Sequence, residues 1–575
     1  MTAAATRLRG GGCVASRPAV GADDAPPTMD DIGDLHLATE ERDPRWDIAG
    51  FNAAFEELQI GSVRVGYLRK FCHTGGELPR RSMLSVNETT FHLGAPPAGV
   101  QLYAVDYCWY SRQKPEDPER TRLKKLVEVL DKDGAFDDDL VFWDWASVWM
   151  LNDRDTEHDS LRQKQITAWA SYCSTHFRIK MIIIPDAPLS AERAETSYFE
   201  RLWCLHGFSV STFTQRIVNS ANPIVSAHMT PEWLMNTSSK LNDAACTVEA
   251  DRKGIMSVRA TLAHRMPPAR TDAKGFQTVC RVANFRWVLV SFVHQLAERG
   301  GPAPRRQELP AGSYIEGIVP IDRQPWVVSY AWASVQHFSP SGAKIKELSS
   351  ALRALGAAMT DVVFLDHMSL WQTGRELPQA YAVQNGVIDQ MVDYRYGRVK
   401  QADMTKGQEK EMRFALYEST RLYAFAGGKL PNGRLVPGCK VLVLPRIEVP
   451  ESFPDCGEIT TALNEFCHPP REEKLSAWGF CKSLKYHQGG WTCAEYSVAR
   501  KNGTIANASH EDVREVEIAR EWPDDVAAYA LMMDEASEKP VAFTRKGDRE
   551  AVRFNFFKYV YSFDNVSADS AGHEA

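Results

Sequence analysis

The chain has 575 residues, and one hydrophobic core rarely serves so long a chain, so two or more domains are expected. Its formal net charge of -7 at pH 7 argues against a broadly basic surface that binds nucleic acid or anionic membranes. Its longest apolar runs, such as residues 287–290, fall far short of the roughly 18–20 residues that cross a bilayer.

The cysteines suggest a cytoplasmic protein. The 12 cysteines are scattered without a Cys-x-x-Cys pair, which is typical of reduced thiols. Residues 1–46 are rich in Ala, Gly and Pro, so a disordered leader is predicted, with a transit peptide as the alternative. A short disordered tail is predicted at residues 566–575.

The chain contains one pattern twice. Residues 75–84 read Gly-Gly-x-x-Pro-Arg-Arg-x-x-Leu, and the same pattern recurs at residues 300–309. Further landmarks return in the same order: Val105-x-Tyr107-x-Trp109 as Val328-x-Tyr330-x-Trp332, Phe142-x-Asp144-x-x-Ser147-x-Trp149 as Phe364-x-Asp366-x-x-Ser369-x-Trp371, and Trp203 as Trp491. Solenoid repeats are only about 20–50 residues long. We therefore predict an internal duplication, with module 1 at residues 50–285 and module 2 at residues 286–565.

Each module shows the same order of predicted elements. A lead segment is followed by an extended run, a helix with apolar residues at helical spacing, a continuous apolar run, a second helix and a third apolar run. Continuous apolar runs are typical of strands that are covered on both faces of a parallel sheet. In module 1 these elements are residues 63–71, 100–105, 123–130, 140–143, 163–172 and 181–184; in module 2 they are 288–296, 326–329, 345–355, 362–365, 410–423 and 441–444.

This order predicts an α/β fold of two tandem flavodoxin-like, doubly wound modules, each with a mainly parallel sheet. Module 2 is the longer one because of insertions near residues 376–405 and 446–485, which are predicted to be loops.

Ligands of such sheets bind beyond the carboxyl ends of the strands, where the repeated residues of module 2 are expected. Tyr330 and Trp332 end the first strand, Asp366 and Ser369 end the second, and Trp491 and Glu495 follow the third. Together they predict a substrate cleft with aromatic walls and carboxylates. In the alternative interpretation the aromatic residues belong to the core, Asp366 caps a turn and Glu495 is solvated on a helix.

Two other groups of residues allow a binding role. Arg305 and Arg306 are candidates for holding a phosphate, because guanidinium groups bind such oxyanions bidentately; the alternative is that they tie a loop to neighbouring carboxylates. Several cysteines and histidines of the second insertion are zinc-ligand types, but their spacing matches no standard zinc site, and no metal is predicted. They are Cys456, Cys467, His468, Cys481 and His487.

Three motifs of module 2 resemble those of the Toll/interleukin receptor (TIR) domain, a flavodoxin-like module. Residues 327–330, Val-Val-Ser-Tyr, are similar to the end of its first strand. Residues 363–366, Val-Phe-Leu-Asp, are similar to its second strand with the terminal aspartate. The segment from Trp491 to Glu495 is similar to the Trp-Cys-x-x-Glu helix start after the third strand. The resemblance implies tandem, divergent TIR-like domains.

In enzymatic TIR domains this glutamate cleaves the nicotinamide–ribose bond of NAD, so the resemblance implies that Glu495 is catalytic and that NAD is a substrate; no bound cofactor is expected. Module 1 has Asp106 before its tyrosine and Gly207 in place of the glutamate, so it is expected to lack this chemistry. Two alternatives stay open: a non-catalytic scaffold or adaptor that self-associates, and a phosphate-ligand binding protein. A homo-oligomer and protein partners are expected, and neither nucleic acid nor membrane.

Overall fold

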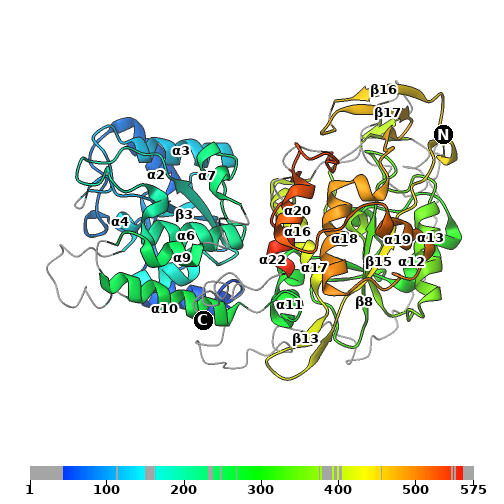
Figure 1. Ribbon diagram of the computed structural model, residues 1–575, viewed down its shortest axis with the longest axis horizontal. Coiled ribbons are helices and arrows are strands. Elements are labelled where there is room, and N and C mark those ends of the chain that lie inside the picture. Colours follow the sequence, from blue (N-terminus) through cyan, green and yellow to red (C-terminus); the bar gives the residue numbers. More distant parts are fainter. Residues whose placement is uncertain are drawn as a thin grey trace, which may run out of the picture.

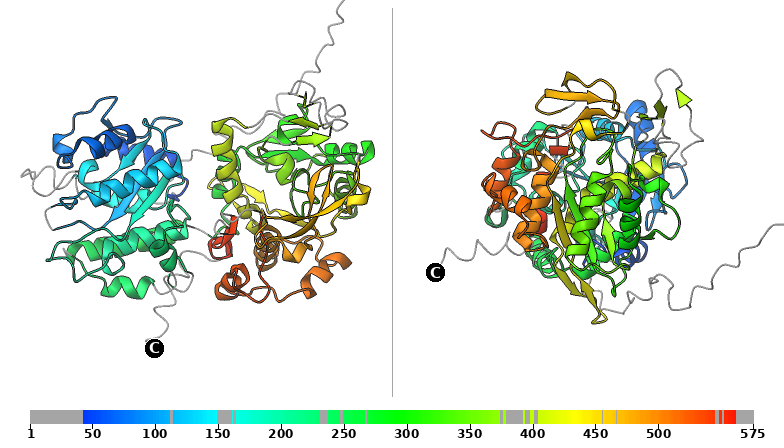
Figure 2. Two further views of the ribbon diagram at one scale, coloured as in Figure 1. Left: turned by 90° about the horizontal axis from the view of Figure 1, so that it is seen from above. Right: turned by 90° about the vertical axis from the view of Figure 1, so that its right-hand side faces the viewer.

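The computed structural model describes residues 43–560, apart from 112–113, 149–160, 162–163, 231–232, 234–236, 247–248, 267, 374–375, 379–391, 394–397, 401–403, 455, 466, 545–547 and 550–551. Two α/β bodies lie side by side, one built from the first half of the chain and the other from the second half (Figures 1 and 2). Trp149, most of the predicted leader and the predicted tail lie outside the described residues.

Module 1 is built on a five-stranded sheet in the order β2-β1-β4-β3-β5. Its strands are β1 (Gly61–Arg64), β2 (Phe91–Leu93), β3 (Leu102–Tyr107), β4 (Leu140–Phe142) and β5 (Ile179–Ile184). The central strand β3 is parallel to both β4 and β5. By contrast, β1 is antiparallel to β4 and to β2.

Module 2 has a sheet with the same order and the same pairing directions, β7-β6-β9-β8-β15. Its strands are β6 (Arg286–Leu289), β7 (Tyr314–Glu316), β8 (Pro325–Tyr330), β9 (Val362–Phe364) and β15 (Lys440–Leu444). The α/β class is therefore confirmed. The prediction of mainly parallel sheets is wrong, because only β8–β9 and β8–β15 are parallel, while β6 pairs antiparallel with β7 and β9.

The lead segments explain why the sheets are mixed and not mainly parallel. Each was expected to be one element, yet each is a four-residue strand followed by a helix: β1 by α2 (Val65–Thr74) and β6 by α12 (Val290–Arg299). Parallel neighbours require a crossover connection. The α3 (Thr121–Asp133) and α13 (Ala343–Ala354) crossovers supply it for the central strands. The lead strands β1 and β6 instead pair antiparallel with the outer side of β4 and β9.

Helices cover both faces of each sheet, which is why the central strands are largely apolar. All six residues of β3 and of β8 are buried. On one face α3 and α13 pack against alternate strand residues such as Val105 and Val328. On the other face lie α6 (Leu202–Phe213) and α18 (Gly490–Asn502).

An asparagine extends each sheet past its third parallel strand. Ile217 and Ile505 form isolated parallel bridges to Met181 and Val441. Two residues later, Asn219 Nδ2 donates to the Ile183 carbonyl at 2.7 Å, and Asn507 Nδ2 donates to the Val443 carbonyl at 2.8 Å. This paired feature was not predicted from the sequence.

The remaining helices surround these layers. They are α1 (Ile48–Glu57), α4 (Asp144–Ser147), α7 (Pro223–His228), α9 (Thr237–Asp243), α10 (Glu249–Arg265), α11 (Ala273–Val282), α14 (Asp366–Ser369), α16 (Lys406–Glu418), α17 (Thr420–Ala424), α19 (Glu511–Ile518), α20 (Val526–Met533) and α22 (Asn555–Val560). Although α11 falls within the predicted range of module 1, Phe276 in it stacks on Phe425 of module 2 with ring centroids 4.1 Å apart.

The two insertions of module 2 contain strands where loops were predicted. The described part of the first holds β10 (Glu376–Pro378), β11 (Val392–Asp393) and β12 (Arg398–Lys400), and the second holds β16 (Thr460–Asn464), β17 (Arg471–Ser476) and β18 (Gly479–Cys481). Both form antiparallel sheets, and β13 (Gly427–Lys429) and β14 (Leu435–Pro437) form a separate pair. Their short strands are mostly polar and lack the apolar runs that predicted the central sheets.

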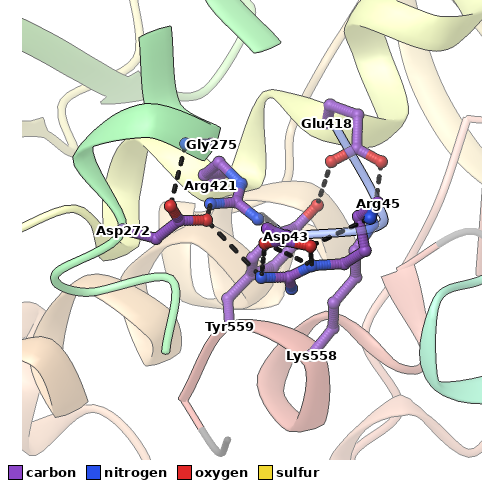
Figure 3. Close-up of polar contacts among 8 residues, drawn as sticks. All are labelled: Asp43, Arg45, Asp272, Gly275, Glu418, Arg421, Lys558 and Tyr559. Carbon is purple, nitrogen blue, oxygen red and sulfur yellow. Dashed lines mark hydrogen bonds and ion pairs between the residues drawn. The ribbon is translucent and has the colours of Figure 1, made fainter. Parts of the chain in front are cut away.

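Buried ion pairs join the modules (Figure 3). Arg45, which precedes α1, pairs with Asp43 at 2.6 Å and with Asp272 at 3.5 Å, and Arg421 of α17 also pairs with Asp272 at 2.9 Å. Glu418 pairs with Lys558 of α22 at 2.9 Å and lies 3.5 Å from Arg216 of module 1. We call these residues the intermodule ionic cluster. Because Asp43 and Arg45 are buried, the leader predicted at residues 1–46 ends a few residues too late.

Candidate functional site

The candidate site lies at the carboxyl end of β8, where two carboxylates approach from opposite faces of the sheet. Successive strand residues point to opposite faces, so the last two residues of β8 lead in different directions. Tyr330 points toward the α13 face and Asp366, and Ser329 points toward the α18 face and Glu495. The sequence analysis predicted three of these four residues as a site.

Asp366 is held by three donors. The Tyr330 hydroxyl donates to Oδ1, Trp332 Nε1 donates to Oδ2 at 3.2 Å, and the His367 backbone N–H donates to Oδ1 at 2.5 Å. Burial raises the pKa of Asp366, while these hydrogen bonds and the charge of Lys482 lower it. The carboxylate is thereby fixed in one orientation at the end of β9.

Glu495 reaches the same strand end from α18. Ser329 Oγ donates to Glu495 Oε2 at 2.5 Å, and the Tyr486 hydroxyl lies 2.6 Å from Ser329 Oγ. The pKa of Glu495 is raised to about 8, because burial and the charge of Asp366 together outweigh the hydrogen bonds of Ser329 and Tyr423 that lower it. The two carboxylates are therefore within electrostatic reach of each other.

The exposed fractions of these groups suit a binding surface better than a closed core. Glu495, Asp366 and Trp332 are partly exposed, whereas Ser329 and Tyr486 are buried beneath them. A partly exposed pair of carboxylates beside an aromatic ring can attract a cationic ring or hold hydroxyl groups.

Two residues predicted to bind substrate lie elsewhere in the hydrogen-bond network. Ser369 is fully buried, and its Oγ accepts from the Leu365 backbone N–H at 3.0 Å, so its hydroxyl closes the turn after β9. Trp491 is on the first turn of α18, and its Nε1 donates to Asp548 Oδ2 at 3.1 Å. Ser369 is thus a structural residue, and the only polar group of Trp491 is engaged with Asp548.

The arginine pair also has structural partners. Arg305 is buried and its Nε donates to Glu308 Oε1 at 3.0 Å. Arg306 is buried too, and its Nη1 donates to the carbonyls of Asn284 at 2.6 Å and Ser369 at 2.7 Å. Burial lowers the pKa of Arg306 to about 10. These contacts favour the alternative interpretation, in which the pair ties loops together.

Module 1 reproduces the aspartate network of module 2. The Tyr107 hydroxyl donates to Asp144 Oδ1 at 2.6 Å, Trp109 Nε1 donates to Oδ2 at 2.9 Å, and the Trp145 backbone N–H donates to Oδ1 at 2.6 Å. Asp144 matches Asp366 donor by donor.

The second carboxylate of module 1 comes from a different element. Asp106 on β3 occupies the position of Ser329, and a Cβ atom placed on Gly207 of α6 would lie 2.0 Å from Asp106 Oδ2. The Tyr198 hydroxyl donates to the Cys204 carbonyl at 3.4 Å, whereas the matching Tyr486 hydroxyl lies 2.6 Å from Ser329 Oγ. Module 1 therefore has an acidic side chain at this strand end, although on β3 and not on the helix. That module 1 lacks the chemistry stays a prediction.

The Asp106 site is more deeply buried than the Glu495 site. Asp106 is only 4% exposed, and burial raises its pKa well above the ordinary range. Burial disfavours the ionised form of a carboxyl group. Because Asp106 is more deeply buried than Glu495, the two second carboxylates lie in different environments.

Sequence reasoning missed two tyrosines and the role of the strand residue before Tyr330. Tyr198 and Tyr486 each stand five residues before the repeated tryptophan, so extending the Trp203 and Trp491 match upstream would have found them. Tyr423 donates to the Val328 carbonyl at 3.1 Å, but no repeated motif marked it.

No group of three or more potential metal ligands occurs among the described residues. Cys467, one of the zinc-ligand types in the second insertion, instead accepts a hydrogen bond from Asn464 Nδ2 at 2.9 Å. Within the described part of the chain, no helix is long and apolar enough to span a membrane.

Comparisons with known proteins return no relative. No family model, no curated protein and no solved structure matches the chain. The functional argument therefore depends on the geometry of the two modules.

Proposed function

We propose that module 2 is a TIR-like catalytic domain that hydrolyses the bond between nicotinamide and ribose in NAD, with Glu495 as its catalytic residue. The observation that carries this proposal is the position of Glu495. Its carboxylate lies at the carboxyl end of β8, is partly exposed, and is within electrostatic reach of Asp366. In a doubly wound sheet this edge is where ligands bind.

The chemistry requires a negative charge beside a developing positive one. When the bond breaks, its electron pair stays on the nicotinamide nitrogen, and the ribose carbon acquires oxocarbenium character. Water then adds to that carbon, so NAD and water give ADP-ribose, nicotinamide and a proton. The Glu495 carboxylate stabilises the ribosyl cation and engages the ribose hydroxyls.

The raised pKa of Glu495 is consistent with a site that becomes ionised when a cation binds. With its pKa raised to about 8, Glu495 is mostly neutral at pH 7. A pyridinium ring beside it favours the ionised form, so binding of NAD is expected to lower that pKa. Trp332 is partly exposed beside the two carboxylates, where its ring already has Lys482 Nζ 5.9 Å from its centroid, and Tyr330 positions Asp366.

The test is release of nicotinamide from NAD by the purified full chain, compared with Glu495→Gln. We expect the variant to lose activity by about 100-fold or more. Glu515→Gln, which changes an exposed glutamate of α19, is the matched control and should keep full activity. Equal rates for the wild type and Glu495→Gln would rule out this function.

The internal duplication and the cytoplasmic location are also proposals. We infer that the modules arose by internal duplication of a flavodoxin-like unit, and the equal strand orders and matching aspartate networks support this. A cytoplasmic location is supported by the eleven cysteines that the structure describes, all of which are free thiols.

Self-association is the second candidate function, and it rests on strand β16. This strand is at one edge of its sheet, and Leu463 in it is 56% exposed. An exposed edge strand offers unpaired backbone groups to another chain. Light scattering after size-exclusion chromatography tests it: a scaffold forms oligomers that Leu463→Lys disrupts, and a monomer at all concentrations would exclude this alternative.

A further inference from the structure

Two cysteines of module 1 face each other at the carboxyl end of β3. Cys108 follows the last residue of β3, and Cys204 is the third residue of α6. Their Sγ atoms are 3.5 Å apart, and both side chains are buried. The residues are 96 positions apart in the sequence, so only the fold brings them together.

The pair belongs to module 1 alone. In module 2 the positions that match Cys108 and Cys204 are Ala331 and Thr492, neither of which carries a thiol. The pair lies beside Asp106, because Cys108 follows Asp106 by two residues and the Cys204 thiol donates to the Tyr107 carbonyl at 3.7 Å. The two thiols and the strand carboxylate of Asp106 therefore occur together in module 1, and neither has a counterpart at the matching positions of module 2.

The surroundings distinguish the two sulfurs. The hydrogen bond from Cys204 lowers the pKa of Cys108, as do the charges of Arg201 and Arg122. Arg122 Nε also donates to the Cys108 carbonyl at 2.6 Å, which holds the guanidinium close. Burial raises the pKa of Cys204. Because the thiolate is the reactive form, Cys108 is the nucleophile and Cys204 the resolving thiol.

The distance suits a reduced pair that is ready to close. A disulfide bond is about 2.05 Å long, so the two sulfurs need to move together by roughly 1.5 Å. Rotation of the two side chains can supply such a shift, since both sulfurs are terminal atoms. No other residue has to leave the space between them for this closure.

We propose that Cys108 and Cys204 form a redox-active pair that a peroxide oxidises to a disulfide. The Cys108 thiolate attacks one oxygen of hydrogen peroxide, which gives a sulfenic acid and hydroxide. The Cys204 sulfur then attacks the sulfenyl sulfur, and the Cys204 proton leaves with the hydroxyl group as water. One peroxide is reduced while the two sulfurs are each oxidised by one electron.

The bond would join the carboxyl end of β3 to the first turn of α6. It closes a long loop and restricts the unfolded chain, so the oxidised form should melt at a higher temperature than the reduced form. This inference is independent of the proposed NAD hydrolysis, because it concerns sulfur chemistry in module 1.

The test treats the reduced full chain with hydrogen peroxide, blocks remaining thiols by alkylation and maps the peptides by mass spectrometry. We expect a linked pair of peptides containing Cys108 and Cys204, lighter by two hydrogen atoms, which dithiothreitol separates. The melting temperature should rise on oxidation and fall again on reduction.

Matched variants make the result specific. Cys204→Ser and Cys108→Ser should abolish the linked peptide and the rise in melting temperature, whereas Cys173→Ser, a buried cysteine of the same module, should retain both. The proposal is overturned if peroxide modifies the partly exposed Cys72 and Cys246 while Cys108 and Cys204 remain unlinked. The wild-type peptide map decides the question even if a serine variant does not fold.

Discussion

Both modules have one carboxylate shortly after a strand, and each has a second carboxylate that comes from a helix in module 2 and from a strand in module 1. Asp144 and Asp366 each follow a strand and each accept from a tyrosine, a tryptophan and a backbone N–H. At the second position module 2 has Ser329 on the strand and Glu495 on the helix, whereas module 1 has Asp106 on the strand and Gly207 on the helix. Each module therefore has a second carboxylate at this strand end, but a different element carries it.

The largest expected effect comes from giving module 1 both carboxylates. In Gly207→Glu the new Cβ meets Asp106 Oδ2 at 2.0 Å, and two acids then compete for one buried space. We expect the free energy of unfolding to fall by about 4 kcal/mol, as for overpacking combined with a buried unpaired charge. Chemical denaturation followed by tryptophan fluorescence measures it.

The double variant sharpens this prediction. Asp106→Ser with Gly207→Glu reproduces the Ser329–Glu495 pair and should recover most of the lost stability, giving a large favourable coupling energy in a double-mutant cycle. Gly207→Ala, which adds the Cβ atom without an acid, should cost less than Gly207→Glu. If the costs of the two single changes simply add, the proposed exchange of carboxylates is incorrect.

The second prediction compares the shared aspartates. Asp366→Asn and Asp144→Asn each disturb three matched hydrogen bonds, so both should lower the free energy of unfolding by about 2 kcal/mol. Only Asp366→Asn is expected to reduce nicotinamide release, by about tenfold or more, because module 2 carries the proposed catalysis. An equal loss of activity in both variants would show that the proposed division of function is wrong.

The sequence predicted the α/β class and the central strands because apolar runs and repeated motifs report burial directly. It missed the antiparallel lead strands, since pairing direction depends on how the chain returns to the sheet. The sequence predicted that Tyr330, Asp366 and Glu495 lie near one another, because each follows or ends a strand of one sheet, and the structure has them close to the end of β8. It did not point to Asp106, because a comparison of matched positions does not show that a strand residue of one module can contact the helix position that carries the acid in the other module.

The third prediction uses the raised pKa of Glu495. Its pKa is about 8 in the folded protein and near the ordinary 4.5 when unfolded, so between these values the folded state binds a proton that the unfolded state has released. The free energy of unfolding of the wild type therefore falls as the pH rises through this range. Glutamine cannot ionise, so Glu495→Gln should match the wild type near pH 4.5 and exceed it by about 2 kcal/mol above pH 8.

Denaturation curves from pH 4.5 to 9 measure this difference, and Asp106→Asn should show the same sign in module 1, where burial also raises the pKa of the acid. Glu515→Gln is the control, since that glutamate is exposed. A stability difference for Glu495→Gln that does not change with pH would contradict the assignment of a raised pKa to Glu495.

The smallest expected effect separates a positioning role from a binding role for the tryptophans. Trp332→Phe removes the donor to Asp366, and Trp109→Phe removes the matching donor to Asp144, so each should cost about 1 kcal/mol of stability. Phenylalanine keeps an aromatic face, although its attraction for a cation is weaker than that of tryptophan. If Trp332 stacks on the pyridinium ring, Trp332→Phe should raise the KM for NAD a few-fold and leave kcat nearly unchanged, while Trp109→Phe changes neither. A fall in kcat at constant KM would instead assign Trp332 to the positioning of Asp366, because only the orientation of that carboxylate would then have changed.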